Sequence, residues 1–102
     1  MVSADSGEFE GFEWDQWKSD ATLAARGFDF DAAGEVFEGP YLEREDRRRE
    51  SGERRWVATG ETRAGVITVV WTPRGRVRRI ITAWRASRRE RREYRDYRQA
   101  HE

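Results

Sequence analysis

Three β-branched or aromatic runs between residues 56 and 86 constrain the fold of this chain more than any other feature. They cover residues 56–62, 66–72 and 76–86, and only the tripeptides Arg-Ala-Gly and Pro-Arg-Gly separate them. Short connections that contain glycine are typical of hairpins between antiparallel strands. We therefore expect a three-stranded antiparallel meander whose central strand is residues 66–71.

The segment before these runs predicts a short strand and a first helix. The strand would carry the aromatic residues Phe9, Phe12 and Trp14. Asp15 can cap a helix over residues 16–26, and Gly27 can end it because glycine adopts the left-handed conformation without steric cost. On this helix Lys18 would lie on the exposed side, opposite a face that carries Trp17, Ala21 and Ala24.

A second helix is predicted to follow at once. Asp29 can cap it, and the Gly-Pro pair at residues 39–40 would stop it. Its buried face would hold the residues at positions i, i+3 and i+7, which are Phe30, Ala33 and Phe37. Tyr41 and Leu42 can start a short strand, and the polar residues 43–53 are expected to form a mobile hairpin loop.

The C-terminal end of the chain predicts a third helix. Ser87 and Glu90 have the spacing of a capping box, so the helix would begin there and run to about Arg98. Tyr94 and Tyr97 would hold it against the sheet.

Length and composition set the outer bounds of the fold. The 102 residues suffice for one domain, and 13% aromatic residues can supply the large apolar surfaces that disordered chains lack. We expect an α+β fold in which an N-terminal strand and two helices pack on the small antiparallel meander. The domain would span residues 9–98, with flexible ends at 1–8 and 99–102.

Charge is distributed unevenly along a chain whose formal net charge is zero. Residues 1–46 contain thirteen acids and three bases, whereas residues 74–98 contain eleven arginines and three acids. So much positive charge on one compact segment indicates a polyanionic partner. We expect these guanidinium groups to form a single electropositive surface open to solvent, with the alternative that some pair with acids of the N-terminal half.

Missing features exclude several classes of protein. Without cysteine the chain cannot form disulfides, thiolate nucleophiles or cysteine-based zinc sites. No signal-peptide pattern opens the chain, and no apolar run approaches a membrane span. We therefore expect a cytoplasmic protein that has no membrane partner, no metal and no cofactor.

An ordered set of short motifs resembles the BrnT family of small toxins over roughly residues 12–97. The motifs are residues 12–15 (Phe-Glu-Trp-Asp) with Lys18, Gly27 before Phe30, Phe37 leading to Pro40, Gly52-Glu53 with Arg55-Trp56, and residues 79–83 running into 88–91. The resemblance implies a fold like that of RelE-type ribonucleases. It also implies a translation-blocking ribonuclease that forms hetero-oligomers with a neutralising, DNA-binding, BrnA-like antitoxin.

The residue inventory limits the chemistry of such a ribonuclease. The only histidine, His101, is next to last, so an ordinary histidine acid/base pair is missing. Cleavage without metal then needs the 2′-hydroxyl of RNA as nucleophile, a carboxylate or amine to take its proton, and arginines to stabilise the phosphorane. The candidates for these catalytic roles are Lys18, Glu53, Arg55, Arg79 and Arg85.

Each candidate also has a simpler explanation. Lys18 could be a solvated helix charge, and Glu53 with Arg55 could be a loop ion pair that contributes little. Arg79 and Arg85 are predicted to share one face of the last strand, where a guanidinium can hold a phosphate through two parallel donors.

Other side chains of the C-terminal third are candidates for binding partners. Phosphates of RNA would contact Arg78, Arg88, Arg89 and Arg92. The antitoxin would contact side chains of the types common at interface hot spots, here Trp71, Trp84, Arg91, Arg95 and Tyr97. A plain solvated face is the alternative for the arginines of the last helix.

Departures from the family pattern leave the activity open. Residues 25–27 read Ala-Arg-Gly where the family usually has Lys-His-Gly, Arg49 stands where histidine is often found, and Trp84 stands where arginine is common. Three functions therefore remain: a translation-blocking ribonuclease, a catalytically weakened relative that acts mainly as a binding partner, and a plain RNA-binding module.

Overall fold

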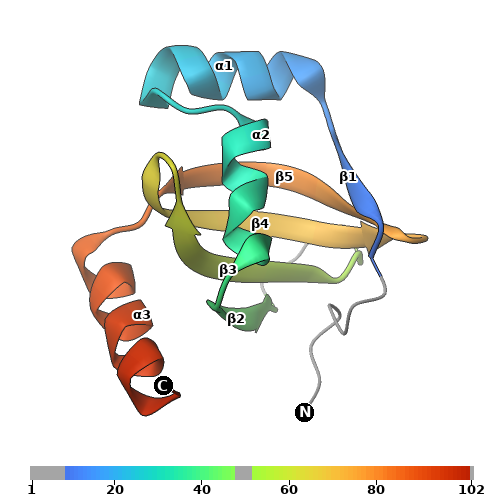
Figure 1. Ribbon diagram of the computed structural model, residues 1–102. Coiled ribbons are helices and arrows are strands. Elements are labelled where there is room, and N and C mark those ends of the chain that lie inside the picture. Colours follow the sequence, from blue (N-terminus) through green and yellow to red (C-terminus); the bar gives the residue numbers. More distant parts are fainter. Residues whose placement is uncertain (1–8, 48–51, 102) are drawn as a thin grey trace.

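Strands from both halves of the chain form one mixed sheet in the order β1-β5-β4-β3-β2 (Figure 1). The computed structural model describes residues 9–47 and 52–101. Its strands are β1 (Gly11–Trp14), β2 (Tyr41–Asp46), β3 (Arg55–Thr62), β4 (Gly65–Arg74) and β5 (Val77–Arg85). As predicted, β3, β4 and β5 form an antiparallel meander with β4 in the middle. The sequence did not reveal that β1 adds to it in parallel beside β5.

The first helix, α1 (Gln16–Arg26), has the predicted bounds because both of its ends are specified locally. The Asp15 carboxylate accepts hydrogen bonds from the backbone N–H groups of Trp17, at 2.9 Å, and Lys18. Gly27 ends the helix with φ of 85°, a conformation that side chains disfavour.

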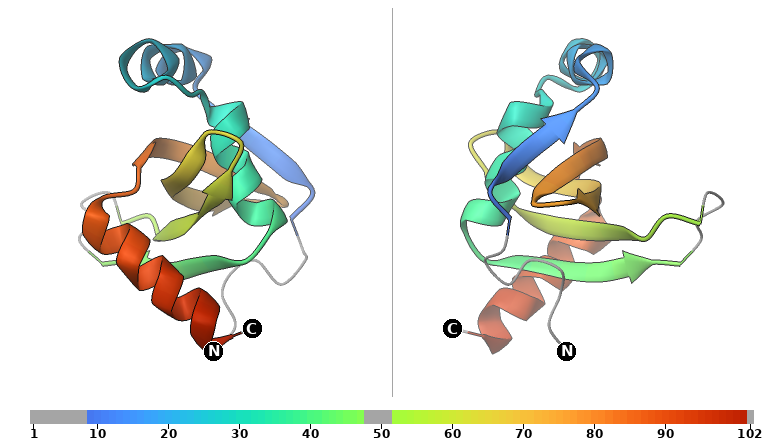
Figure 2. Two further views of the ribbon diagram at one scale, coloured as in Figure 1. Left: turned by 60° about the vertical axis from the view of Figure 1, so that its left-hand side comes forward. Right: turned by 90° about the vertical axis from the view of Figure 1, so that its right-hand side faces the viewer.

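The second predicted helix divides into two segments, α2 (Phe30–Ala33) and the 3₁₀ helix η1 (Gly34–Glu38). Together they cross one face of the sheet, called here the helical face (Figures 1 and 2). The core lies between these two segments and the sheet. It consists of apolar side chains that include Phe30, Ala33, Val36, Ile67, Val69 and Trp71. Phe30 and Ala33 are buried as predicted, whereas Phe37 is only half-buried.

The predicted loop over residues 43–53 is wrong at its beginning, because β2 continues to Asp46 along β3. The acidic side chains of this edge strand find partners within the sheet. Glu43 accepts a hydrogen bond from Trp71 Nε1 at 2.8 Å, and Glu45 accepts one from Arg54 Nε at 3.0 Å. Charged residues are common on edge strands, where they discourage pairing with another chain. The rest of the predicted loop includes residues 48–51, which lie outside the described part of the chain.

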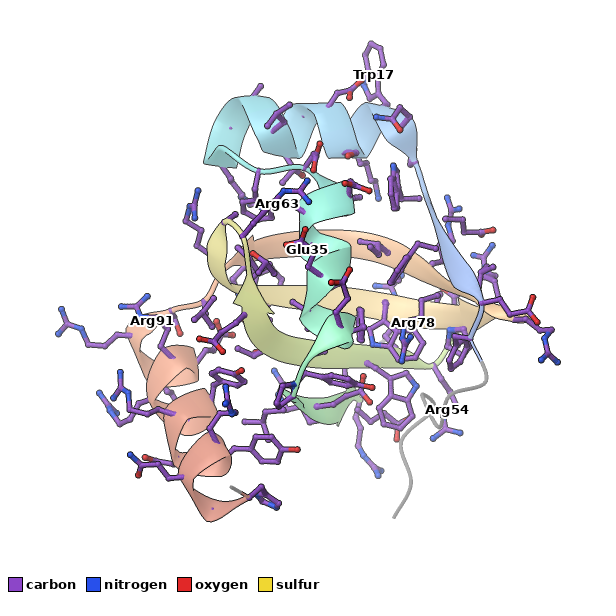
Figure 3. All side chains as sticks on the ribbon, viewed as in Figure 1. Trp17, Glu35, Arg54, Arg63, Arg78 and Arg91 are labelled. Atoms are coloured by element: carbon purple, nitrogen blue, oxygen red, sulfur yellow. The ribbon has the colours of Figure 1, made fainter. Side chains whose placement is uncertain are left out.

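Helix α1 presents its apolar residues to solvent, contrary to the usual arrangement of an amphipathic helix. Trp17 is 83% exposed and projects away from the fold in Figure 3. The buried residues of α1 are Ser19 and Thr22. Ser19 faces inward because its Oγ accepts a hydrogen bond from the Phe30 N–H at 3.0 Å, at the start of α2. Lys18 is exposed as predicted, but Trp17 is exposed as well.

The hairpin between β3 and β4 is tied to the helical segments by Arg63. Its backbone N–H and guanidinium both donate to Glu35 on η1, and its Nη2 donates to Asp31 at 3.1 Å. Figure 3 shows Arg63 and Glu35 close together. Hydrogen bonds to Asp31 and Glu35 raise the pKa of Arg63 above its ordinary value.

The last helix, α3 (Arg88–Ala100), begins with the predicted capping box and continues to Ala100, past the expected end near Arg98. Tyr94 is its buried anchor, and the Tyr94 hydroxyl donates to the Pro40 carbonyl at 3.2 Å. Tyr97 is half-buried, and its ring lies 4.4 Å from that of His101. In Figures 1 and 2, α1 and α3 lie at opposite ends of the molecule.

Arg78 is a core residue, contrary to the prediction that it contacts RNA. It is 9% exposed, and its guanidinium carbon lies 4.8, 4.1 and 4.8 Å from the ring centroids of Phe9, Phe37 and Trp71. Its Nη2 also donates to the Tyr41 hydroxyl at 3.3 Å. The rings stabilise the buried charge through cation–π contacts, so this arginine joins η1 and the segment before β1 to the sheet.

Replacing Arg78 with alanine should therefore destabilise the fold by about 2 to 4 kcal/mol, because it removes the cation–π contacts and leaves a cavity among the rings. Chemical denaturation measures this. Arg76→Ala is the matched control, since Arg76 is exposed and forms an ion pair with Glu10, and should cost less than about 1 kcal/mol. Equal losses for the two variants would contradict a core role for Arg78.

Candidate active site

A β-bulge in β5 decides which of its arginines share a face. Val70 of β4 pairs with Thr82, but the next residue, Trp71, pairs with Ile80, so Ile81 has no partner. The extra residue reverses the alternation of side chains. Arg79 therefore lies on the face opposite the helical face, called here the site face, whereas Arg85 lies on the helical face.

The predicted shared face of Arg79 and Arg85 is therefore wrong. The guanidinium of Arg85 stacks over the Phe28 ring at 5.4 Å, and its Nη1 donates to the Ala64 carbonyl at 2.6 Å. Arg85 thus links the β3–β4 turn to the segment after α1.

Three of the five predicted catalytic residues belong to one charged cluster on the site face. Arg79 Nη1 donates to Glu13 Oε2 at 3.0 Å, and Arg74 Nη1 lies 3.9 Å from the same oxygen. Arg74 Nη2 donates to Glu53 Oε2 at 3.1 Å, and Arg55 Nε lies 4.0 Å from Glu53 Oε1. The cluster, called here the arginine cluster, consists of Glu13, Glu53, Arg55, Arg74 and Arg79.

Sheet register places these residues together. Glu13 of β1 and Thr72 of β4 are the two cross-strand partners of Arg79, and Asp46 of β2 is the partner of Arg55. Since cross-strand partners point to the same face, they line up across the sheet. Glu13 and Arg74 were not among the predicted site residues, because the parallel pairing of β1 with β5 is what brings the N-terminal acid to the C-terminal arginines.

The arginine cluster is partly covered by the sheet and partly open to solvent. The side chains of Arg55, Arg79 and Glu53 are each about one-third exposed. The Nε of Arg55 is buried and has no hydrogen-bond partner among the described residues. Three guanidinium groups and two carboxylates give the cluster a net positive charge, so it can attract a phosphate and also holds carboxylates that can accept a proton.

A cavity of about 460 Å³ lies beside the start of α3 on the same face of the sheet. Its lining includes Arg44, Val57, Thr59, Arg89, Glu90 and Glu93. Glu90 Oε1 accepts hydrogen bonds from Ser87 N, Trp84 Nε1 and Thr68 Oγ1, at 2.8, 3.1 and 3.2 Å. Because these bonds hold the helix to the sheet, we interpret Glu90 as a structural carboxylate.

The remaining predicted site residues are separated from the arginine cluster. Lys18 is exposed on α1 and makes none of the contacts that hold the cluster together. Trp71 is fully buried in the core, so it cannot contact an antitoxin at the surface as predicted. Trp84 is half-buried, and its Nε1 donates to Glu90. Arg49, where the family pattern favours histidine, lies outside the described residues.

The arginines of α3 fall into two groups. Three have a partner: Arg89 pairs with Glu93 at 3.1 Å, Arg91 donates to the Ala86 carbonyl at 2.7 Å, and Arg98 donates to Glu61 at 2.9 Å. The others share the outward face of the helix at positions i, i+4 and i+7, and we call them the α3 stripe: Arg88, Arg92 and Arg95. Within residues 9–47 and 52–101, no side chain or carbonyl pairs with this stripe.

The expectation of a single open electropositive surface is wrong. Arg74 and Arg79 pair with Glu13, and Arg76 pairs with Glu10 at 2.6 Å. The alternative expectation, that N-terminal acids pair with some of these arginines, is confirmed for them. The unpaired positive charge is concentrated on the α3 stripe.

No helix in the described part of the chain is long and apolar enough to cross a membrane. Among the same residues, no three acidic or histidine side chains gather closely enough to hold a metal ion.

Comparison with known proteins agrees with the resemblance seen in the motifs. The model of one family, described as the ribonuclease toxin BrnT of type II toxin–antitoxin systems, matches residues 14–90. No curated protein matches the chain significantly. The matched segment runs from the end of β1 into the first turn of α3 and contains most of the arginine cluster. Since it covers most of the sequence, the chain belongs to the BrnT family of ribonuclease toxins of type II toxin–antitoxin systems.

Proposed function

We propose that this toxin cleaves RNA at the arginine cluster, without a metal ion, by attack of the 2′-hydroxyl on the adjacent phosphate. The observation that supports this most directly is that the ion pairs of Arg74 bring Glu53 and Arg55, at the start of β3, together with Arg79 of β5 on one partly open surface. Cleavage of cytoplasmic RNA in this way would block translation. The meander and the preceding helices also support a RelE-like fold.

The cluster contains groups suited to each step of this reaction. Glu53 would accept the proton of the 2′-hydroxyl, because it places a carboxylate, a common general base, within the cluster. Arg55, Arg74 and Arg79 would stabilise the negative charge that builds up on the phosphorane oxygens. A leaving 5′-oxygen needs a proton from another donor, for which solvent is available at this exposed site.

RNA flanking the scissile phosphate would bind along the α3 stripe. Arg88, Arg92 and Arg95 have no partner among the residues that the structure describes, so they can contact phosphate without breaking an ion pair there. Arg89 would contribute less than predicted, because it already pairs with Glu93.

The type II family implies an antitoxin partner. We propose a BrnA-like, DNA-binding antitoxin that forms a hetero-oligomer with the toxin and contacts the accessible residues among those predicted, namely Trp84, Arg91, Arg95 and Tyr97. Trp17 joins this set because it is the most exposed large apolar side chain of the described residues, and such side chains are common in interfaces.

One observation favours a catalytically weakened relative as the second candidate function. The arginines of the cluster are already paired with Glu13 and Glu53, and the single histidine lies at the far end of α3, beside Tyr97. A protein with this site could bind antitoxin and RNA but cut RNA slowly.

Growth measurements distinguish the two functions. Expression of the chain alone should arrest growth, because the proposed ribonuclease removes translatable RNA, whereas expression of Arg79→Ala should permit it. Immunoblots control for equal protein levels. Normal growth at high levels of the folded wild-type protein would favour the weakened relative.

Purified protein should cut single-stranded RNA in the presence of EDTA, and Arg79→Ala should lower the rate about 100- to 1,000-fold, because it removes a donor to the phosphorane. Arg76→Ala is the control, since Arg76 pairs with Glu10 outside the cluster and should change the rate little. Cleavage that EDTA abolishes would refute the metal-independent reaction.

Replacing all three residues of the α3 stripe with glutamine should weaken RNA binding and lower the slope of log affinity against log salt by about 2, since each lost phosphate contact on a single strand contributes about 0.7. Titrations over a range of salt concentrations measure the slope. Arg89→Gln, which removes a paired arginine from the same helix, should change it less. An unchanged slope in the triple variant would exclude the stripe from RNA binding.

A further inference from the structure

The oxygen atom Glu13 Oε2 lies between two guanidinium groups from different strands. Arg79 Nη1 donates to it at 3.0 Å, and Arg74 Nη1 lies 3.9 Å away. Arg74 also donates to Glu53 on its other side, at 3.1 Å. The oxygens of a carboxylate and of a phosphodiester both accept hydrogen bonds from the paired N–H groups of arginine. An oxygen of a phosphodiester can therefore take the position that Glu13 Oε2 has between the two arginines.

We propose that the space between Arg74 and Arg79 is a phosphodiester subsite and that Glu13 occupies it until RNA displaces the carboxylate. This inference rests on the proposed function and deepens it: it names the two arginines that take the phosphate and the internal anion that competes for them. Glu13 thus competes with phosphate for the subsite. The sequence match to the family begins one residue after Glu13.

The Glu13 carboxylate can move away from Arg74 and Arg79 without disturbing the fold. The side chains of Glu13 and Arg79 are 41% and 31% exposed, so solvent screens their attraction and the carboxylate has room to turn outward. Glu13 lies on β1, the edge strand of the sheet, and backbone pairing with β5 holds this strand independently of the side chain.

The exchange leaves the net charge of the cluster unchanged. Three arginines and two carboxylates make the cluster positive by one charge while Glu13 is bound in it. When Glu13 turns into solvent, the remaining excess of two positive charges attracts the phosphodiester, which returns the cluster to its earlier balance.

The test measures binding of a short, mixed-sequence 2′-O-methyl oligoribonucleotide, which cannot be cut through its 2′ position, by fluorescence anisotropy at low salt. Glu13→Gln keeps the shape of the side chain but removes the competing charge, so affinity should rise about three- to fivefold. Glu10→Gln removes the same charge from a carboxylate that pairs with Arg76 outside the cluster, and should change affinity less than about twofold.

A double-mutant cycle then locates the effect. The gain from Glu13→Gln should disappear in an Arg79→Gln background, because no freed guanidinium remains to bind the phosphate. Equal gains for the Glu13 and Glu10 variants, a gain that persists without Arg79, or a loss of affinity in Glu13→Gln would each overturn the proposal. Denaturation curves check that the variants fold. The readout is binding, so a protein that binds RNA in this way but fails to cut it would refute the proposed cleavage and leave the subsite intact.

Discussion

The parallel pairing of β1 with β5 joins the N-terminal segment to the meander and brings the acids of one to the arginines of the other. It brings an acidic strand against an arginine-rich one, so Glu13 lies opposite Arg79 and Glu10 pairs with Arg76. A chain with zero net charge thereby neutralises part of its positive surface internally. The same pairing assembles the arginine cluster, because it places a carboxylate beside the arginines at the end of the meander.

Arginine has three different physical roles in this fold. Arg78 is a buried cation whose charge is satisfied by aromatic rings, and Arg85 donates to a carbonyl of a turn. The arginines of the arginine cluster pair with carboxylates, which an anion can replace. The α3 stripe is exposed and has no partner in the described chain. The number of arginines in a segment therefore says little about a binding surface until each side chain has been assigned to a face.

The elements that could be predicted are those whose signals lie within a few residues. Asp15, Gly27 and Asp29 bound the helices as expected, and Ser87 caps α3 through Glu90. The meander followed from its alternating runs and short turns. The strand character of residues 43–46 was missed because its charged side chains resemble a loop until their partners on β3 and β4 are known.

The helix starts, the end of α1, the antiparallel meander, the lack of cysteine chemistry and the resemblance to the BrnT family could all be read from the sequence. The folded chain was needed to show that Trp17 faces solvent, that Arg78 lies in the core and that Arg79 and Arg85 lie on opposite faces. Caps and turns depend on contacts between neighbours in the chain. The face of the sheet on which a side chain lies, and the ion pairs that it forms, depend on strand register and on the bulge at Ile81. Both are set by pairing between segments far apart in sequence.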